Sequence, residues 1–337
     1  MRRNLIGLCL IVSFLACSLP AAWGEDKPAV TEGSTGQNVL WVDPVDLASR
    51  NLLFGPGGDQ GQPKGPMTFV EEDRAGTNPK FEVLDNDGTK WKAKLGVEAR
   101  PETVATRLLW AVGYFADQDY MLANLQVEKM PTRLRRGQHL VGPGGKLENV
   151  RLERHIKGED KVGEWRWKKN PFTGTREFNG LRVMMALINN WDLKDQNNAI
   201  YSEKAYPEKQ FYAVSDLGAT FGSTGFGWTQ ASSKGNLKSY RRSKFISKVT
   251  TDYVDFNVPT RPVWIRFFGL PAYISRLHMR EIGKRVPRAD AKWMGGLLAK
   301  LSAEQIRDAF RSGGYSSEDV EGFAGALEKR IAELNKL

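Results

Sequence analysis

Hydrophobic and polar residues alternate along the first third of the chain in a way that predicts short β-strands. Residues 89–95 read Thr-Lys-Trp-Lys-Ala-Lys-Leu, so every second side chain is apolar and the others are mostly lysines. This two-residue period is typical of a strand with one buried face. Residues 80–84 form another such run, and Asp-Asn-Asp-Gly at 85–88 predicts a hairpin turn between the two. Further short strands are expected at 67–74, 120–127 and 150–156.

The later part of the chain mostly shows the helical period of three to four residues. Pro101 opens the first helix and Gly113 ends it, and an apolar helix is expected at 177–190. Residues 199–201 and 210–214 predict a β-hairpin, whereas 222–262 is rich in Gly, Ser and Lys and is expected to be irregular. Three helices are expected at the end, at 290–301, 302–310 with a Ser302 start, and 316–334 with Ser317 as the cap. Strands with one helix, followed mainly by helices, predict an α+β chain with two lobes.

The N-terminal 24 residues have the pattern of a secretory signal peptide. Two arginines precede a short apolar core, and Ala22-Trp23-Gly24 provides a small-x-small cleavage site. We therefore expect a secreted or periplasmic protein, with a lipid anchor at Cys17 as the alternative to simple cleavage. Residues 25–38 are polar and are expected to form a flexible leader. No other stretch approaches 18 apolar residues, so no transmembrane span is expected in the mature chain.

Composition excludes several classes of chemistry. Both cysteines, Cys9 and Cys17, lie in the expected signal peptide, so the mature chain is expected to have no disulfide, zinc-thiolate site or cysteine nucleophile. The three histidines have no metal-ligand spacing, and neither a Gly-x-Ser-x-Gly nor a Walker loop is present. The net charge of +10 indicates either a solvated basic surface or attraction to anionic ligands at the basic clusters 133–136 and 240–244. No nucleic-acid-binding motif accompanies this charge.

One polar stretch combines three residue types that phosphoryl transfer requires. Asp192, Lys194 and Asn197 stand at spacings of two and five residues, after the apolar helix and before a short strand. The carboxylate, ammonium and amide groups could serve a proton acceptor, a developing phosphoryl charge and a metal ion, respectively. The alternative is a polar turn between a helix and a strand.

Two further motifs suit the same chemistry. Asp216-Leu-Gly ends an apolar strand, as a metal ligand followed by a sharp turn would, although a simple strand-ending turn has the same pattern. Lys94 ends the alternating strand, and Glu102 in the next helix can reach back to it, with Glu98 as the second candidate. The alternative for this strand is a solvated, lysine-rich sheet edge.

In this order the motifs resemble those of the protein-kinase-like superfamily, and particularly its atypical HipA-like, phosphoinositide-kinase-like and secreted-kinase branches. The resemblance spans about residues 50–220. It implies a mainly β N-lobe with one helix at 39–158, and a mainly α C-lobe at 159–337. It also implies ATP and Mg²⁺ as cofactors. The implied roles are catalysis by Asp192 and Lys194, nucleotide binding by Lys94 and Glu102, and metal binding by Asn197 and Asp216.

The chain also departs from the kinase pattern. Asn190-Trp191 replaces the usual His-Arg, and no Ala-Pro-Glu follows Asp216-Leu-Gly. The Gly/Pro loop 54–66 does not match the glycine-rich loop of kinases, and it is expected either to cover phosphates or to form an exposed linker.

These motifs favour a secreted phosphotransferase that moves the γ-phosphoryl group of ATP to a hydroxyl acceptor in a Mg²⁺-dependent reaction. Arg241 and Arg242 would help to dock an anionic substrate. The alternatives are a catalytically inactive kinase-fold binding module in the cell envelope, and an unrelated extracytoplasmic α+β binding protein. The sequence leaves open whether the protein is an active enzyme, which acceptor it uses and how many copies associate.

Overall fold

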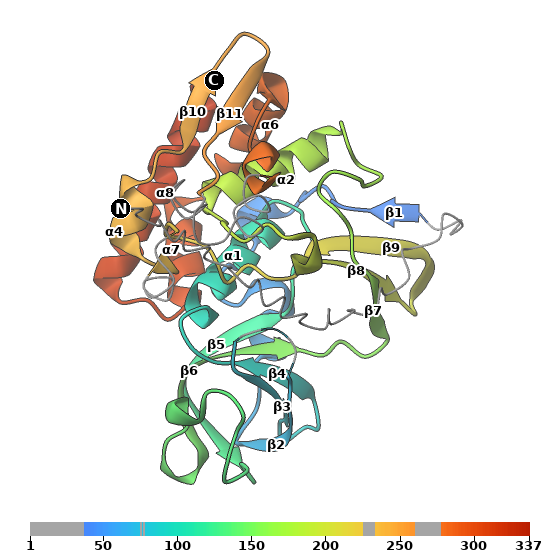
Figure 1. Ribbon diagram of the computed structural model, residues 1–337, viewed down its shortest axis with the longest axis vertical. Helices are drawn as coiled ribbons and strands as arrows, with labels where there is room; N and C mark the ends of the chain where they lie inside the picture. The colour runs from blue at the N-terminus through green and yellow to red at the C-terminus, as the bar shows by residue number, and fades with distance from the viewer. Residues whose placement is uncertain (1–36, 75, 77, 225–232, 260–277) are drawn as a thin grey trace, which may run out of the picture. The chain divides into compact units, whose positions relative to one another are not determined.

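The computed structural model describes residues 37–74, 76, 78–224, 233–259 and 278–337 (Figure 1). The expected signal peptide and the possible lipid site at Cys17 lie outside these residues. The last two residues of the expected flexible leader begin strand β1, Gln37–Val39. No helix in the described part of the chain is both long and apolar enough to span a bilayer.

The first group of strands closes into a barrel with the order β2-β3-β4-β6-β5. The parallel pair β2–β5 closes the barrel, and the other neighbours are antiparallel. Apolar side chains from alternate positions fill its interior, as the period of the sequence predicts. The strands are β2 (Met67–Glu72), β3 (Lys80–Leu84), β4 (Lys90–Lys94), β5 (Asp119–Glu128) and β6 (Lys146–Arg154).

The lysine-rich strand β4 is one of the strands that form the barrel wall, so it is not a sheet edge. It pairs with β3 on one side and with β6 on the other. Trp91 and Ala93 are buried in the interior, as expected. Burial of these two side chains on one face requires Lys90, Lys92 and Lys94 to point to the opposite face.

Helix α1, Ala99–Ala111, follows β4 and contacts β5, β6 and the later helix α7 (Figure 1). It begins two residues before Pro101, with Glu98 as the N-cap residue. Its apolar residues, including Val104 and Leu108, belong to the larger hydrophobic core that the C-terminal helices share. The helix that carries Glu102 is therefore packed into the C-terminal core.

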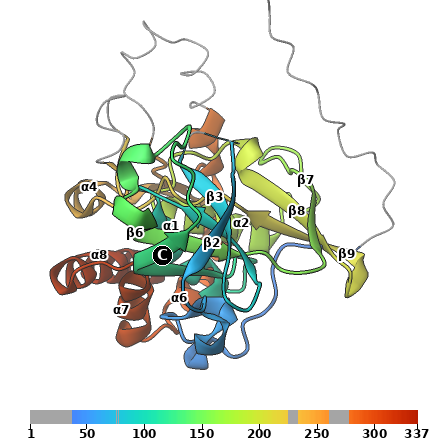
Figure 2. The same cartoon turned by 90° about the horizontal axis from the view of Figure 1, so that it is seen from below.

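A second sheet has the strand order β1-β9-β8-β7, and β7, β8 and β9 run side by side in Figure 2. The expected hairpin is present as β8 (Asn198–Glu203) and β9 (Tyr206–Val214), with Ala199 opposite Ala213. Its turn is shorter than expected, because β9 extends back to Tyr206. Strand β7, Glu159–Gly163, pairs with β8. Helix α2, Arg176–Leu187, precedes the hairpin and begins where the Thr175 side chain accepts a hydrogen bond from Phe178 N.

The segment expected to be irregular, 222–262, contains regular structure in its described part. Helix α4 spans Leu237–Arg242, and β10 (Ile246–Val249) and β11 (Tyr253–Phe256) form a small sheet with β12 (Val286–Pro287). Composition misled the prediction because the few large apolar residues, such as Tyr240 and Phe256, are fully buried.

The C-terminal helices are α6 (Arg288–Leu298), α7 (Ala303–Ser312) and α8 (Ser317–Asn335). Ser302 and Gln305 form a reciprocal capping box at the start of α7, as the sequence indicates. Helix α8 is capped by Ser316 and not by Ser317, because the Ser316 side chain accepts from Asp319 N. Short 3₁₀ turns span Leu47–Ser49, Gly55–Gly57, Asp59–Gly61, Gln138–Leu140, Pro143–Gly145 and Asp195–Asn197.

Candidate active site

Lys94, at the end of β4, lies among three carboxylates. Its Nζ is 2.6 Å from Glu102 Oε2, 3.2 Å from Glu98 Oε2 and 3.5 Å from Asp216 Oδ1. Burial acts to lower the pKa of Lys94, but the combined field of Glu102, Asp216 and Glu98 outweighs it and raises the pKa above its usual value. Lys94 therefore carries a positive charge among these carboxylates at physiological pH.

The two glutamates come from the start of α1, one turn apart. Glu102 is buried, which raises the pKa of its carboxyl group, although Lys94 and Arg151 act in the opposite direction. The start of a helix favours negative charge because its first N–H groups are unpaired. Both candidates named from the sequence thus contact Lys94, with Glu102 the nearer. Glu98 also accepts from Asn78, in the turn between β2 and β3.

Asp216 lies two residues after the end of β9, and its side chain contacts Lys94. Burial acts to raise its pKa, whereas Lys94 and a hydrogen bond from Gly218 N to Oδ1 lower it, and the net change is downward. Its side chain is 42% exposed, so it remains open to a ligand from solvent. A Cβ atom on Gly218 would lie 2.7 Å from Glu98 Cβ. Gly218 is therefore required by this close approach of the chain to the start of α1.

The catalytic-loop candidates form a compact group around the 3₁₀ turn that ends at Asn197. Lys194 Nζ is 2.8 and 2.9 Å from the two carboxylate oxygens of Asp192. Asn197 Nδ2 donates to the main-chain oxygen of Asp192 over 2.6 Å. This bond fixes the orientation of the amide and makes its Oδ1 atom the one suited to a metal ion.

Main-chain hydrogen bonds join the loop of Asp192 to Asp216. The carbonyl oxygen of Asn197 accepts from Ser215 N over 2.8 Å and from Asp216 N over 3.3 Å. Trp191 N donates to Ala219 O over 3.1 Å on the other side of the same motif. The structure therefore brings Asp192, Asn197 and Asp216 together through the backbone, and Asp216 in turn contacts Lys94.

The stretch Asn189-Asn190-Trp191, which immediately precedes Asp192, anchors this loop. Its last two residues stand where kinases usually have His-Arg. The Asn189 side chain donates to Gly222 O and accepts from Arg330 of α8 over 2.8 Å. Asn190 Oδ1 accepts from Asp192 N over 3.0 Å. Both asparagines are fully buried, so this departure from the pattern supplies the polar contacts that hold Asp192 in place.

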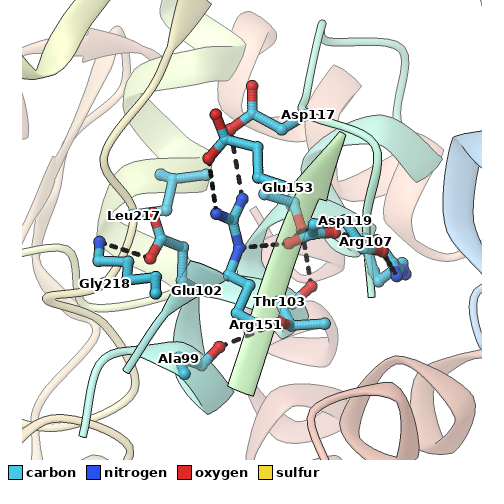
Figure 3. A network of polar contacts seen from close by, with 12 residues as sticks. Ala99, Glu102, Thr103, Arg107, Asp117, Asp119, Arg151, Glu153, Leu217 and Gly218 are labelled. Carbon is cyan, nitrogen blue, oxygen red and sulfur yellow. Dashed lines mark hydrogen bonds and ion pairs between the residues drawn. The ribbon is translucent and has the colours of Figure 1, made fainter. Parts of the chain in front are cut away.

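A buried ionic network supports α1 on the side of β5 and β6 (Figure 3). Asp119 accepts from Arg107 and, over 2.5 Å, from Arg151 Nε. Arg151 also contacts Glu153 at 2.8 Å and Asp117 at 3.3 Å. Burial raises the pKa of Asp117, and so does the nearby carboxylate of Glu153. The network ties the middle of α1 to the barrel, and Arg151 also acts electrostatically on Glu102.

The Gly/Pro loop 54–66 packs behind this network. Tyr120 donates from its hydroxyl to Gly58 O over 2.8 Å, and a Cβ atom on Gly55 would lie 2.6 Å from the Arg107 guanidinium. The loop is packed against α1 and β5, and is not the free linker considered from the sequence. The turn that reaches the Lys94 cluster is instead the one between β2 and β3, through Asn78.

Arg241 and Arg242, which the sequence suggests for docking an anionic substrate, lie in α4. They line a cavity of about 860 Å³ together with residues of α8. Lys234 was missed by sequence reasoning, yet its ammonium pairs with Glu98. No local pattern marks it, because it stands in a Gly/Ser/Lys-rich stretch 136 residues beyond its partner.

No model of a known protein family matches this chain, and no curated protein matches its sequence. Among solved structures, the chain is similar to the Helicobacter pylori proinflammatory kinase CtkA, with 10% identity, a TM-score of 0.44 and coverage of 81% of this chain and 97% of that one. It is also similar to the Golgi casein kinase, with 11% identity, a TM-score of 0.31 and coverage of 81% and 73% of the two chains.

The described residues have an α+β fold. A β-barrel with one helix precedes a mainly helical part, and the loop of Asp192 and the Asp216-Leu-Gly turn follow in the expected order. The α+β class predicted from the sequence is confirmed, with the added finding of two further sheets, one of which joins β1 at the start of the described chain to β7–β9.

Proposed function

We propose that the protein is a phosphotransferase that binds ATP with Mg²⁺ and transfers the γ-phosphoryl group to a hydroxyl acceptor. One observation carries the proposal: Lys94 contacts both Glu102 and Asp216, and the carbonyl of Asn197 joins Asp216 to the loop of Asp192. A polar turn, a strand-ending turn and a lysine-rich sheet edge, taken separately, have no reason to converge in this way.

The available oxygen atoms fit a magnesium ion. Mg²⁺ is usually held in such sites by one or two protein oxygens together with phosphate oxygens and water. Asp216 and Asn197 Oδ1 supply that number, and the described residues contain no cluster of three His, Cys, Asp or Glu side chains that would hold a metal alone. When bound, Mg²⁺ neutralises charge on the phosphates.

Each remaining side chain has a role that its contacts support. Lys94, kept charged and held by Glu102, would bind the phosphates nearest the nucleoside. Asp192 would orient the acceptor hydroxyl and accept its proton. Lys194, 44% exposed and 2.8 Å from Asp192, would move to the transferring phosphoryl group and stabilise its negative charge.

The cellular place of this reaction is a further part of the proposal. The pattern of residues 1–24 supports export, followed by action in the periplasm or outside the cell.

We propose residues 39–158 and 159–337 as the two lobes. Arg241 and Arg242 would then contact an anionic acceptor.

Thermal unfolding of the purified protein with ATP tests the nucleotide site. The wild type should unfold at a higher temperature with ATP and Mg²⁺ together than with either alone, because the bound state is stabilised by mass action. Asp216→Ala should lose this shift. Asp160→Ala, which removes an exposed aspartate on β7, should retain it. Absence of any nucleotide-dependent shift in the wild type would contradict the proposal.

A second measurement separates an enzyme from a binding module. Release or transfer of the γ-phosphoryl group from labelled ATP should occur with the wild type and fall at least about a hundredfold in Asp192→Ala. Magnesium-dependent binding without turnover would instead support the catalytically inactive kinase-fold module.

A further inference from the structure

Lys234 joins the charged cluster around Lys94 although it belongs to none of the motifs. Its ammonium pairs with Glu98 Oε1, while Glu98 Oε2 is 3.2 Å from Lys94 Nζ. The Lys234 side chain is only 14% exposed. Two ammonium groups therefore share one carboxylate. The cluster contains the pair Lys94–Glu102 and, next to it, the pair Lys234–Glu98.

The main chain fixes the position of Lys234. On one side of it, Ser233 O accepts from Ser223 N over 3.2 Å, and on the other side Gly235 N donates to Thr220 O over 2.9 Å. The two segments are so close that a Cβ atom on Gly222 would lie 1.4 Å from Ser233 O. Lys234 is therefore held beside the stretch that follows Asp216-Leu-Gly, unlike a lysine on a free surface.

The neighbours of Lys234 belong to both functional loops. Its Nζ lies 5.6 Å from the centre of the Trp191 ring, and Trp191 immediately precedes Asp192. The ammonium is thus placed between Glu98, at the start of α1, and the loop of Asp192, while the backbone on either side of Lys234 is bonded to the stretch that follows Asp216-Leu-Gly.

We propose that Lys234 is a second phosphate-binding lysine, which contacts the phosphates farthest from the nucleoside. This inference rests on the nucleotide site proposed above. Without nucleotide, Glu98 pairs with both ammonium groups. With nucleotide, a phosphate oxygen replaces Glu98 as the partner of Lys234, because a compact ammonium binds phosphate well as a point charge.

The number of phosphates provides a specific test. Dissociation constants for ATP, ADP and AMP should be measured with Mg²⁺ by calorimetry on the wild type, Lys234→Ala and Lys234→Arg. Loss of one charge-assisted contact predicts that Lys234→Ala binds ATP about ten- to a hundredfold more weakly. AMP binding should change by less than about twofold. Lys234→Arg should recover much of the ATP affinity, and Lys238→Ala, at an exposed position of α4, should leave all three constants unchanged.

Other results would overturn the assignment. Unchanged ATP affinity in Lys234→Ala would remove the proposed contact, and equal weakening of ATP and AMP would reveal a purely structural role. Tighter ATP binding would show that the Glu98 pair opposes the nucleotide. If Lys234→Ala unfolds, Lys234→Gln repeats the measurement with more of the side chain retained. Failure of the wild type to bind any nucleotide would overturn the proposed function as well.

Discussion

At the scale of single residues, the chain buries charged side chains, which normally require a partner of opposite charge. Asp119, Arg107 and Arg151 are almost completely buried, and Asp119 pairs with both arginines. Charged groups in such surroundings are costly to bury and even more costly to leave unpaired. The network therefore holds the position of α1, and through it the position of Glu102, more than it adds net stability.

Removal of Asp119 should show this cost directly. Asp119→Ala leaves two buried guanidinium groups without their shared carboxylate, so the free energy of unfolding should fall by about 3–5 kcal/mol. Urea unfolding of the wild type and the variant measures the difference. Asp87→Ala removes the exposed partner of Lys64 and should leave the free energy of unfolding close to that of the wild type. Equal losses in the two variants would contradict the role given to the network.

The contrast between predicted and missed residues has a physical origin. The sequence suggests Lys94, Glu102, Asp192, Asn197 and Asp216 as candidates because the spacings and the strand or helix contexts that single them out lie within short segments. The sequence does not indicate Lys234 or Asn78, since each meets Glu98 only through the tertiary fold. The contacts of Asn189 and Asn190 were missed for the same reason.

At the scale of elements, prediction succeeded where one face of a segment is apolar. The alternation in β4 and the period of α1 identified both elements, although α1 begins two residues earlier than Pro101 suggests. Composition failed to predict α4, β10 and β11. Tyr240 and Phe256 are buried by residues distant in the sequence, and the Gly, Ser and Lys residues between them obscure any helical or strand period of apolar positions.

The register of β7 on β8 gives a prediction for the pH dependence of stability. Glu159 faces Glu203 across this pair. Burial and then the charge of Glu203 raise the pKa of Glu159 from 4.5 to about 7. The folded chain therefore binds this proton more tightly than the unfolded chain, and the stability it provides is lost as the pH rises from about 4.5 to 7.

Glu159→Gln should accordingly reduce the fall in stability over that range. Urea unfolding at pH 4.5, 6 and 8 for the wild type and the variant measures the effect. Glu208→Gln, which removes an exposed acid on β9, should leave the pH profile close to that of the wild type. A profile for Glu159→Gln that coincides with that of the wild type would argue against a raised pKa.

At the scale of the whole described chain, the apolar residues form two separate clusters. One fills the barrel of β2–β6, and the other extends from Leu40 through α1 to the C-terminal helices. Helix α1 thus bears the partner of a barrel lysine but packs into the other core. We expect its stability to follow that of the C-terminal helices.

Native-state hydrogen exchange can test this division with two matched substitutions. Val320→Ala in α8 should reduce the protection of the α1 amides, because both lie in the larger core. Val83→Ala in β3 should reduce protection in the barrel strands and affect α1 less. Equal effects of both substitutions on all amides would show that the two cores unfold as one unit.

The setting of Lys94 also governs its reactivity as an amine. Only the unprotonated form of a lysine attacks acylating reagents, and three surrounding carboxylates raise the pKa of Lys94 and thereby suppress that form. Exposed lysines should be acylated well before it. A covalent inhibitor aimed at Lys94 would have to displace its acidic neighbours before the nitrogen became a nucleophile.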